Sequence, residues 1–226
     1  MDGHAMNANR DAEAWIVCGF YTPDYRAWAE RLIASLDAHG ASHDIVPRAK
    51  LPGGWEANTM AKAHAVLEAM DQHPDKVIVF VDVDCEVKGD LSPLAQLSGD
   101  VAFYVQSRWR SNGGIRFRVR SGTLVIKPTP AARRFVETWA VVSATAQYGD
   151  VDQTTLMLAI GLVPGASFTP LDAKWCATAG DQVPGPLILH DQASRDVLKV
   201  SRWKRTAHRL FRRWRPAPLV GAPCAS

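Results

Sequence analysis

The stretch KVIVFVDVDCEV, residues Lys76–Val87, joins an apolar run to two acids at its end. The run over residues 77–81 is mostly β-branched, which is typical of a strand that is buried on both faces. Asp82 and Asp84 follow it directly, and side chains two residues apart in an extended chain share a face. Burying either carboxylate ionised and unpaired would cost several kcal/mol. The two acids are therefore either solvated strand-end residues or ligands of a cation.

Apolar strands and amphipathic helices alternate along the chain around this stretch. Gly40 and His73-Pro74 are expected to end the first two helices, and the polar segment Ser107–Arg120 is expected to be a mobile loop. The alternation predicts an α/β fold with a central, mostly parallel mixed sheet that is flanked by helices. Strands are expected near 14–20, 44–47, 77–81, 101–105, 123–126 and 187–189, and helices from Thr22-Pro23, from near Asn58, from Thr129-Pro130 and over 152–160.

The length and composition fit one globular domain with two flanking segments. The chain has 226 residues, of which 47% are hydrophobic and 22% charged. We expect a polar lead over 1–13, a domain over 14–196 and a basic tail over 197–226. The lead lacks the pattern of a signal peptide, and no apolar run approaches the roughly 20 residues that a membrane helix needs. The four cysteines form no C-x-x-C pair, so we expect reduced thiols and a cytoplasmic protein.

The basic charge is concentrated at the C-terminal end. Eight of the 26 Lys and Arg residues lie from Lys199 onward, where there is no acid, so the remainder has 18 basic and 23 acidic residues. Trp203, Leu210 and Trp214 follow one another at spacings of seven and four residues, which would place them on one face of a helix, so residues 199–215 are predicted to bind an anionic membrane surface. That location would be the inner face of the membrane. A packed or disordered tail without a partner is the alternative, and no motif supports nucleic-acid binding.

The two acids at the end of the 77–81 strand suit a hard divalent cation. In a sheet with parallel strands, ligands bind outside the carboxyl ends of the strands, which is where Asp82 and Asp84 lie. Mg²⁺ or Mn²⁺ takes one or two protein carboxylates together with phosphate oxygens of the substrate. The sequence therefore predicts a metal site at this edge of the sheet.

Six segments in a fixed order carry a resemblance to a known family: VCGFYTPDY, WEANTMAKAHAVLEAM, VIVFVDVDCEV, SGTLVIKP, DVDQTTLML and LILHDQAS. Together they span about residues 14 to 196. Their order resembles the GT-A type of nucleotide-diphospho-sugar glycosyltransferases, in particular the glycogenin-like retaining galactosyl- and glucosyltransferases. The resemblance implies a single Rossmann-like GT-A domain.

The resemblance also implies roles for individual residues. The metal would be bound by Asp82, Asp84 and His190. Asp152 and Gln153 would contact the transferring sugar at the reaction centre. The nucleotide-sugar donor would be bound by a larger set, namely Phe20, Tyr21, Thr22, Lys62, Asp82, Val83, Ser121, Gly122 and Arg195. The family commonly has Gly and Lys-Pro after the late His, whereas this chain has Ser194, Arg195 and Lys199, so the diphosphate contact there stays open.

The expected function is transfer of a sugar from a nucleoside diphosphate, with a UDP-sugar as the expected donor, to a glycan or other hydroxyl acceptor. The resemblance favours retention of configuration and Mn²⁺ or Mg²⁺ as cofactor. The metal would stabilise the departing diphosphate, and Asp152 would stabilise the oxocarbenium-like sugar. Four loop arginines would close on the diphosphate, namely Arg108, Arg110, Arg116 and Arg118.

Other interpretations stay open. A sugar-phosphate nucleotidyltransferase shares the sheet, but it would have a Gly-rich loop with Arg and Lys where this chain has GFYTPDY. A catalytically silent domain that binds glycans or membranes is also consistent with the sequence. At the level of residues, Lys62 could be a solvated surface residue, Asp152 a helix N-cap and His190 an ordinary residue at a strand end.

Overall fold

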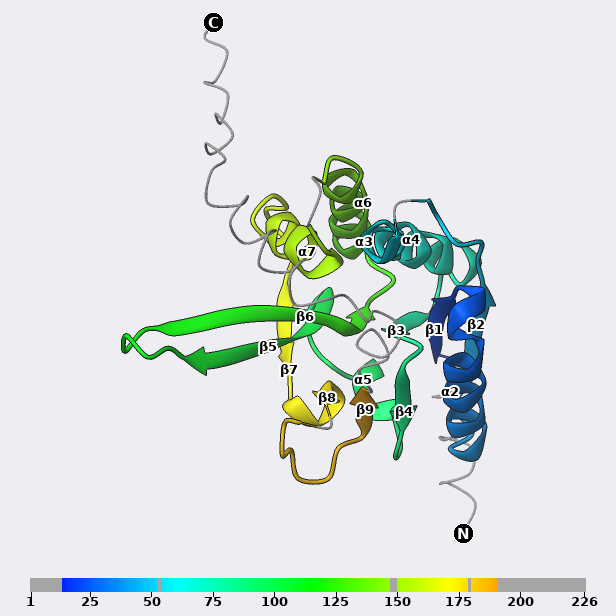
Figure 1. Ribbon diagram of the computed structural model, residues 1–226. Coiled ribbons are helices and arrows are strands. Elements are labelled where there is room, and N and C mark those ends of the chain that lie inside the picture. Colours follow the sequence, from blue (N-terminus) through cyan, green and yellow to red (C-terminus); the bar gives the residue numbers. More distant parts are fainter. Residues whose placement is uncertain (1–13, 53, 147–149, 179, 191–226) are drawn as a thin grey trace, which may run out of the picture. The chain divides into compact units, whose positions relative to one another are not determined.

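The computed structural model describes residues 14–52, 54–146, 150–178 and 180–190, all of them within one compact unit, Met1–Gln192. Its centre is a six-stranded sheet with the order β2-β1-β3-β6-β5-β7 (Figure 1). The strands are β1 (Trp15–Tyr21), β2 (His43–Pro47), β3 (Val77–Val81), β5 (Val101–Trp109), β6 (Ile115–Ile126) and β7 (Phe168–Leu171). The expected domain end at 196 and the basic tail lie outside the described residues.

The sheet is mixed, with more parallel than antiparallel pairs. Strand β1 runs parallel to β2 and β3, and β5 runs parallel to β7. Strand β6 is antiparallel to both of its neighbours, β3 and β5. The predicted fold class, a mostly parallel mixed sheet flanked by helices, is therefore confirmed.

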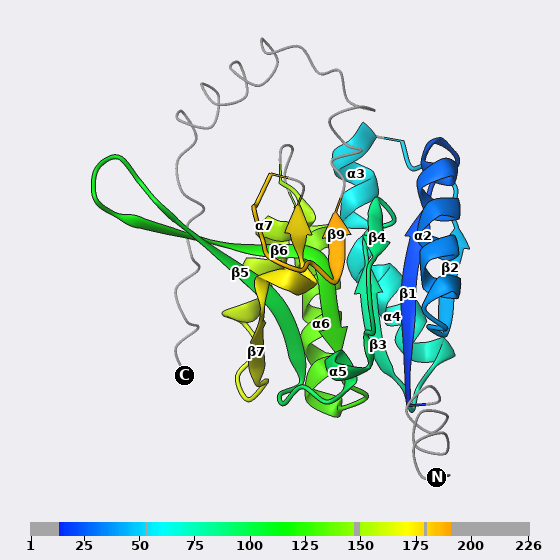
Figure 2. The same cartoon turned by 90° about the horizontal axis from the view of Figure 1, so that it is seen from below.

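Strand β3 lies in the middle of the sheet because both of its faces are apolar. Ile78 and Phe80 pack into one core together with Phe135 and Trp139, on the face covered by α4, α6 and α7. The alternate residues of β3 pack into a second core on the opposite face, which α2, α5 and a small second sheet cover (Figure 2). The helices are α2 (Arg26–Ala38), α3 (Gly54–Met60), α4 (Lys62–Gln72), α5 (Ser92–Ala95), α6 (Pro130–Ala144) and α7 (Asp152–Ile160).

The second sheet positions the end of the described chain. It has the order β4-β9-β8, with β4 (Cys85–Val87), β8 (Ala177–Thr178) and β9 (Ile188–His190). Strand β9 is antiparallel to β4, and its register sets His190 opposite Cys85. Because Cys85 directly follows Asp84 in the chain, this pairing brings His190 to the two acids at the end of β3.

Several predicted boundaries are confirmed and two are wrong. Helix α7 spans the predicted residues, and Gly40 follows α2 with a left-handed φ of 64°, which glycine adopts without strain. Pro23 begins a short 3₁₀ turn, η1 (Pro23–Tyr25), that leads into α2. The helix expected from near Asn58 is instead two helices, α3 and α4, which are separated at Ala61. No helix in the described part of the chain has the length and apolarity to cross a bilayer.

The segment expected to be a mobile loop, Ser107–Arg120, is instead an extension of two strands. Strands β5 and β6 continue as an antiparallel ribbon from Tyr104 and Arg120 out to Trp109 and Ile115, and this ribbon projects from the rest of the sheet (Figures 1 and 2). We call it the arm. The high content of Arg and Gly suggested a loop, but apolar and basic residues alternate over residues 115–119, which is the period of a strand. The alternation, and not the composition, determined the structure.

We predict that Thr129 contributes measurably to the stability of this fold. It caps α6, because its side chain accepts a hydrogen bond from the Ala132 backbone N–H at 3.1 Å, and it donates to Asp100 Oδ1 at 2.6 Å. Thr129→Ala should lower the free energy of unfolding by about 1 kcal/mol in urea titrations. Thr129→Ser keeps the hydroxyl and should stay close to the wild type. Equal losses in both variants would show that the cap contributes nothing.

Candidate metal centre and active site

Three side chains with metal-binding atoms meet at the carboxyl end of β3. One ligand atom from each of Asp82, Asp84 and His190 lies within 4.8 Å of the others. Asp82 and Asp84 are half-buried, and His190 is buried. The structure therefore assembles the three residues that the resemblance implied, although His190 is about a hundred residues away in the sequence.

His190 is held as a neutral imidazole. Its Nε2 lies 2.9 Å from Thr123 Oγ1 on β6. Burial, reinforced by the positive charges of Lys62 and Arg120, lowers the pKa of His190 to about 3. A neutral ring that donates from Nε2 to Thr123 keeps its Nδ1 lone pair for a metal, and metal-binding histidines are commonly fixed in this way. The binding of a metal by His190 stays a prediction.

Gly122, which has no side chain, allows the His190 ring and the Asp82 carboxylate to lie close to the backbone of β6. A Cβ atom at this position would lie 2.9 Å from Cε1 and 3.2 Å from Nδ1 of His190, and 3.4 Å from Asp82 Oδ2. The backbone carbonyl of Gly122 also accepts a hydrogen bond from the Asp82 N–H at 2.9 Å. Nδ1 of His190 and Oδ2 of Asp82 thus lie on the same side of a backbone position that has no room for a side chain.

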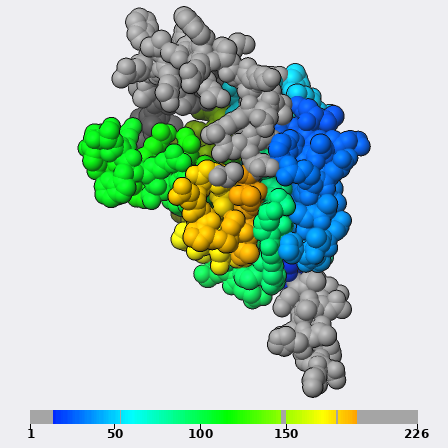
Figure 3. Space-filling model, turned by 60° about the horizontal axis from the view of Figure 1, so that its bottom comes forward, coloured from blue at the N-terminus to red at the C-terminus, as the bar shows by residue number. Residues whose placement is uncertain are grey.

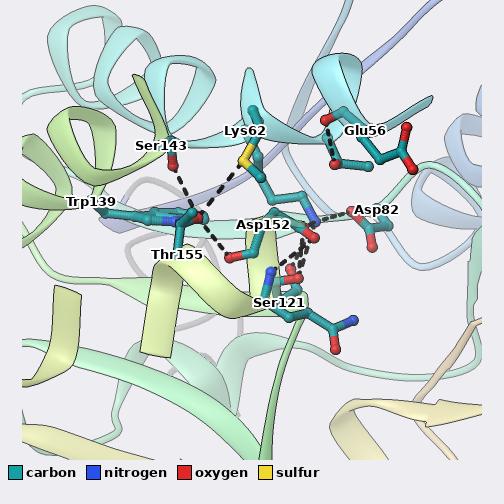
Figure 4. Close-up of polar contacts among 11 residues, drawn as sticks. Glu56, Lys62, Asp82, Ser121, Trp139, Ser143, Asp152 and Thr155 are labelled. Atoms are coloured by element: carbon teal, nitrogen blue, oxygen red, sulfur yellow. Dashed lines mark hydrogen bonds and ion pairs between the residues drawn. The ribbon is translucent and has the colours of Figure 1, made fainter. Parts of the chain in front are cut away.

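A buried lysine connects the metal-binding acids to α7 (Figure 4). Lys62 Nζ lies 2.7 Å from Asp82 Oδ1 and forms a second, closer ion pair with Asp152 Oδ2. It also donates to the backbone carbonyl of Ser121 at 3.2 Å. Burial alone would lower the pKa of Lys62, but the charges of Asp152 and Asp82 outweigh it and raise the pKa. Lys62 is therefore a buried cation, and its interpretation as a solvated surface residue is wrong.

The two oxygens of Asp82 have different partners. Oδ1 is paired with Lys62, while Oδ2 lies on the side of Gly122 and His190. Burial raises the pKa of Asp82 above its ordinary value, although Lys62 opposes this shift. The carboxylate thus lacks part of the positive charge that would keep it ionised, and a divalent cation would supply it. Two carboxylates and a neutral imidazole fit a divalent ion such as Mn²⁺.

Asp152 is the first residue of α7, and both of its carboxylate oxygens have partners within the protein. Its Oδ2 accepts a hydrogen bond from Ser121 Oγ at 2.7 Å in addition to the Lys62 ion pair, and its Oδ1 accepts from the Gln153 N–H at 2.9 Å. Val151, with an extended backbone, occupies the N-cap position, so the interpretation of Asp152 as the N-cap is wrong. A contact of Asp152 or Gln153 with a sugar stays a prediction.

Hydrogen bonds to α6 fix the position of α7 behind this site (Figure 4). Thr155 Oγ1 accepts a hydrogen bond from Trp139 Nε1 at 3.0 Å and contacts Ser143 Oγ at the same distance. It also donates to the backbone carbonyl of Asp152 at 3.1 Å. These hydrogen bonds join α7 to α6, so they hold the helix that carries Asp152 in place.

The three residues expected at the nucleotide, Phe20, Tyr21 and Thr22, lie at the same edge of the sheet but outside this cluster. Phe20 and Tyr21 end β1, which runs parallel to β3, and Thr22 follows it as the N-cap residue of η1. The guanidinium of Arg48 lies over the Phe20 ring, 5.3 Å from its centroid, and Thr22 Oγ1 donates to Asp24 at 2.6 Å. Their role in binding a nucleotide stays a prediction.

Two further expected donor-binding residues are placed differently. The side chain of Val83 is buried in the second core, so only its backbone is available to a ligand at this edge. Arg195 lies outside the described residues. Three of the arginines expected to close as a loop, Arg108, Arg116 and Arg118, lie in the paired strands of the arm, and Arg110 lies in its turn, so the segment is a strand ribbon and not the expected loop.

Two residues at the site were missed in the sequence. Thr123 is fully buried in β6, opposite Val81, and orients His190. A polar residue inside the apolar run of β6 was the available signal. Tyr25 was also missed: burial and the charges of Asp84, Asp24 and Asp82 raise its pKa to about 12.

Comparisons with known proteins agree on the fold. No protein-family model matches the chain, and no curated protein matches it. Among solved structures, a glycosyltransferase involved in the glycosylation of the major capsid of PBCV-1 is 14% identical, with a TM-score of 0.60 over 88% of this chain and 99% of that one. The galactosyltransferase LgtC, in complex with donor and acceptor sugar analogs, is 13% identical, with a TM-score of 0.52 over 78% and 87%.

GlyE of Streptococcus pneumoniae TIGR4, a further glycosyltransferase, is 18% identical, with a TM-score of 0.52 over 78% of this chain. The aligned region covers 54% of GlyE. Similarity at these identities establishes the fold, which is the GT-A fold that the motif order implied. The activity itself needs the separate support of the site.

We predict that Gly122→Ala weakens metal binding. The added methyl group would force the His190 ring away from Asp82, because two rigid groups flank the position. The Kd for Mn²⁺, measured by titration calorimetry, should rise about ten- to hundredfold, as it does when the surroundings of a ligand are disturbed. Gly161→Ala is the matched control, because its nearest new contact would be an ordinary 3.7 Å. Equal Kd values for both variants would contradict the assignment.

We predict a pH dependence that originates in His190. The folded pKa of about 3 lies below the ordinary 6.5, so the unfolded chain binds a proton that the folded protein excludes. This contribution to stability is present above pH 6.5 and is lost as the pH falls toward 3. Below pH 6.5, the free energy of unfolding of the metal-free wild type should fall by roughly 1 kcal/mol per pH unit more than that of His190→Gln. Parallel stability curves in urea titrations from pH 7 to pH 4 would contradict it.

Proposed function

We propose that this chain is a metal-dependent glycosyltransferase that moves a sugar from a nucleoside diphosphate to a glycan or other hydroxyl acceptor. The observation that carries the proposal is the convergence of Asp82, Asp84 and His190 beside the buried Lys62–Asp152 pair. The GT-A fold of the chain supports it, because LgtC has this fold and is a galactosyltransferase. We expect a UDP-sugar as donor and Mn²⁺ or Mg²⁺ as the metal.

The described side chains fit the demands of such a reaction. A divalent cation, when bound, supplies Lewis-acid stabilisation of the departing diphosphate. Asp82, Asp84 and His190 would hold such a cation at the edge of the sheet. Lys62 orients Asp82 through its Oδ1 and leaves Oδ2 on the side of His190. Preorganised charges of this kind stabilise a developing negative charge without further reorganisation.

The sugar is expected next to the N-terminus of α7. Gln153 is half-buried there, directly after the buried Asp152. Since both oxygens of Asp152 have partners within the protein, its contribution to an oxocarbenium-like sugar would be electrostatic, with Gln153 as the direct contact. We favour retention of configuration, as in the family that the motifs resemble.

The location of the reaction is also a proposal. The basic tail over residues 199–215 lies outside the described residues, and its alternation of Arg with Trp suits an anionic membrane surface. We propose a cytoplasmic protein that is peripheral on the inner face of the membrane. Such a location would suit an acceptor that is linked to a lipid.

A thermal-shift screen of nucleotides tests the proposed donor. UDP with Mn²⁺ should raise the Tm, because a ligand that binds only the folded state stabilises it, whereas UDP or Mn²⁺ alone should have smaller effects. Asp84→Asn removes one of two metal carboxylates and should abolish the metal-dependent part of the shift. Asp75→Asn, an exposed acid just before β3, is the matched control and should behave as the wild type.

Turnover separates the proposed enzyme from its alternatives. The wild type with Mn²⁺ should hydrolyse a UDP-sugar slowly to UDP and free sugar in the absence of an acceptor. Release of pyrophosphate from UTP and a sugar phosphate would indicate a nucleotidyltransferase instead. Binding of glycans with no turnover of any UDP- or GDP-sugar would indicate a silent binding domain.

A further inference from the structure

The arm has two chemically different faces. In an antiparallel ribbon, directly opposed residues have their side chains on the same face, and successive pairs alternate between faces. The opposed pairs Trp109–Ile115 and Val105–Val119, together with Phe117, therefore lie on one face. The alternate pairs Arg108–Arg116, Gln106–Arg118 and Tyr104–Arg120 lie on the other.

The apolar face is exposed along the outer half of the arm. The exposed fraction is 78% for Trp109, 62% for Phe117 and 47% for Ile115. Closer to the sheet, Val119 is buried in the core that α4, α6 and α7 cover. The apolar face thus continues outward from this core and leaves its large side chains in solvent. In Figure 3 the arm stands out from the surface of the body.

The second face carries positive charge that the arm itself does not balance. Strands β5 and β6 and their turn contain five arginines and no acid. Arg108 lies directly opposite Arg116, and like charges in this position destabilise a strand pair. The ion pair of Arg108 with Asp181, at 3.8 Å, is on the surface, where such pairs contribute little. The crowding is also seen in Arg118, whose pKa is lowered by burial and by Arg116, Arg120 and Arg108.

We propose that the arm docks on an anionic lipid bilayer, with Trp109, Phe117 and Ile115 in the interfacial region and its arginines against the lipid phosphates. The aromatic residues are of the kind enriched at this depth of a membrane. Long arginine side chains can extend around a ribbon only two strands wide while their guanidinium groups stay in the headgroup layer. A surface of one charge sign next to an apolar face is complementary to anionic lipids, which attract each arginine separately.

The arm also connects this surface to the metal centre. Strand β6 runs from the exposed Ile115 through Arg120 to Gly122 and Thr123, which contact His190. The proposed site of sugar transfer therefore lies on the same strand as the arm, directly beyond Arg120. The docking does not depend on the proposed activity, because it involves none of the metal-binding residues.

Co-sedimentation of the full-length protein with vesicles tests the docking. Vesicles of phosphatidylglycerol and phosphatidylcholine should carry down the wild type, and vesicles of phosphatidylcholine alone should not. Arg108→Gln with Arg116→Gln should lower the partition coefficient about thirtyfold, because each arginine near an anionic surface strengthens binding about five- to sixfold. Arg108→Lys with Arg116→Lys keeps the charges and should stay close to the wild type. Trp109→Ser with Phe117→Ser should lower partitioning at least about tenfold.

Matched controls separate the arm from general effects. Val141→Ser with Leu162→Ser removes two exposed apolar residues outside the arm, of 65% and 60% exposure, and should partition as the wild type. No variant should have a Tm below that of the wild type, since the altered side chains are exposed and the Gln variant removes a pair of opposed like charges. Wild-type binding by both arm variants would overturn the proposal, because any remaining binding would come from elsewhere in the chain.

Two other outcomes would also overturn it. A dimer in light scattering without lipid that Trp109→Ser with Phe117→Ser converts to a monomer would identify a second copy as the partner of the apolar face. Binding that depends on the arginines but not on the aromatic residues, and that soluble polyanions remove completely, would identify an anionic glycan in place of a bilayer.

Discussion

The ion pairs of Lys62 with Asp82 and Asp152 are the interaction on which the site depends. They join the N-terminus of α4 to the end of β3 and to the first residue of α7. Lys62 and the three carboxylates of Asp82, Asp84 and Asp152 have a net charge of −2 when His190 is neutral. Arg120 on β6 offsets a small part of this negative charge. Buried charge of this kind is costly unless it is balanced. A divalent cation between Asp82, Asp84 and His190 would balance it, so the structure explains both why the lysine is buried and why a metal would bind.

The sheet order determines how distant segments reach this point. Strand β6 is antiparallel to β3 and places Gly122 and Thr123 beside the acids. Strand β9 pairs with β4, and this pairing places His190 next to the same acids. Gly122 leaves room for the ring, and Thr123 fixes its orientation. Each contact is specific to one backbone position, which is why small changes at Gly122 are expected to have large effects on metal binding.

Part of this architecture could be predicted from the sequence. The apolar run of β3 with its two acids, the cap of α6 at Thr129 and the bounds of α7 were all read from local patterns, because local propensity and capping determine them. The motif order also identified His190. The burial of Lys62 could not be predicted, since it depends on two carboxylates that only the fold brings together. The arm was misread because its Arg-rich composition concealed a strand period, and the break between α3 and α4 had no signal in the helical spacing.

Electron spin-echo measurements on the Mn²⁺-loaded protein test the metal centre most directly. The spectrum of the wild type should show modulation by one directly bound ¹⁴N nucleus, from the His190 imidazole, and His190→Gln should remove it. Addition of UDP should then introduce coupling to ³¹P from the diphosphate while the ¹⁴N signal stays. A spectrum of fully hydrated Mn²⁺ with no nitrogen or phosphorus coupling, at concentrations where the protein is saturated with metal, would contradict the assignment of Asp82, Asp84 and His190 as the site that holds the nucleotide sugar.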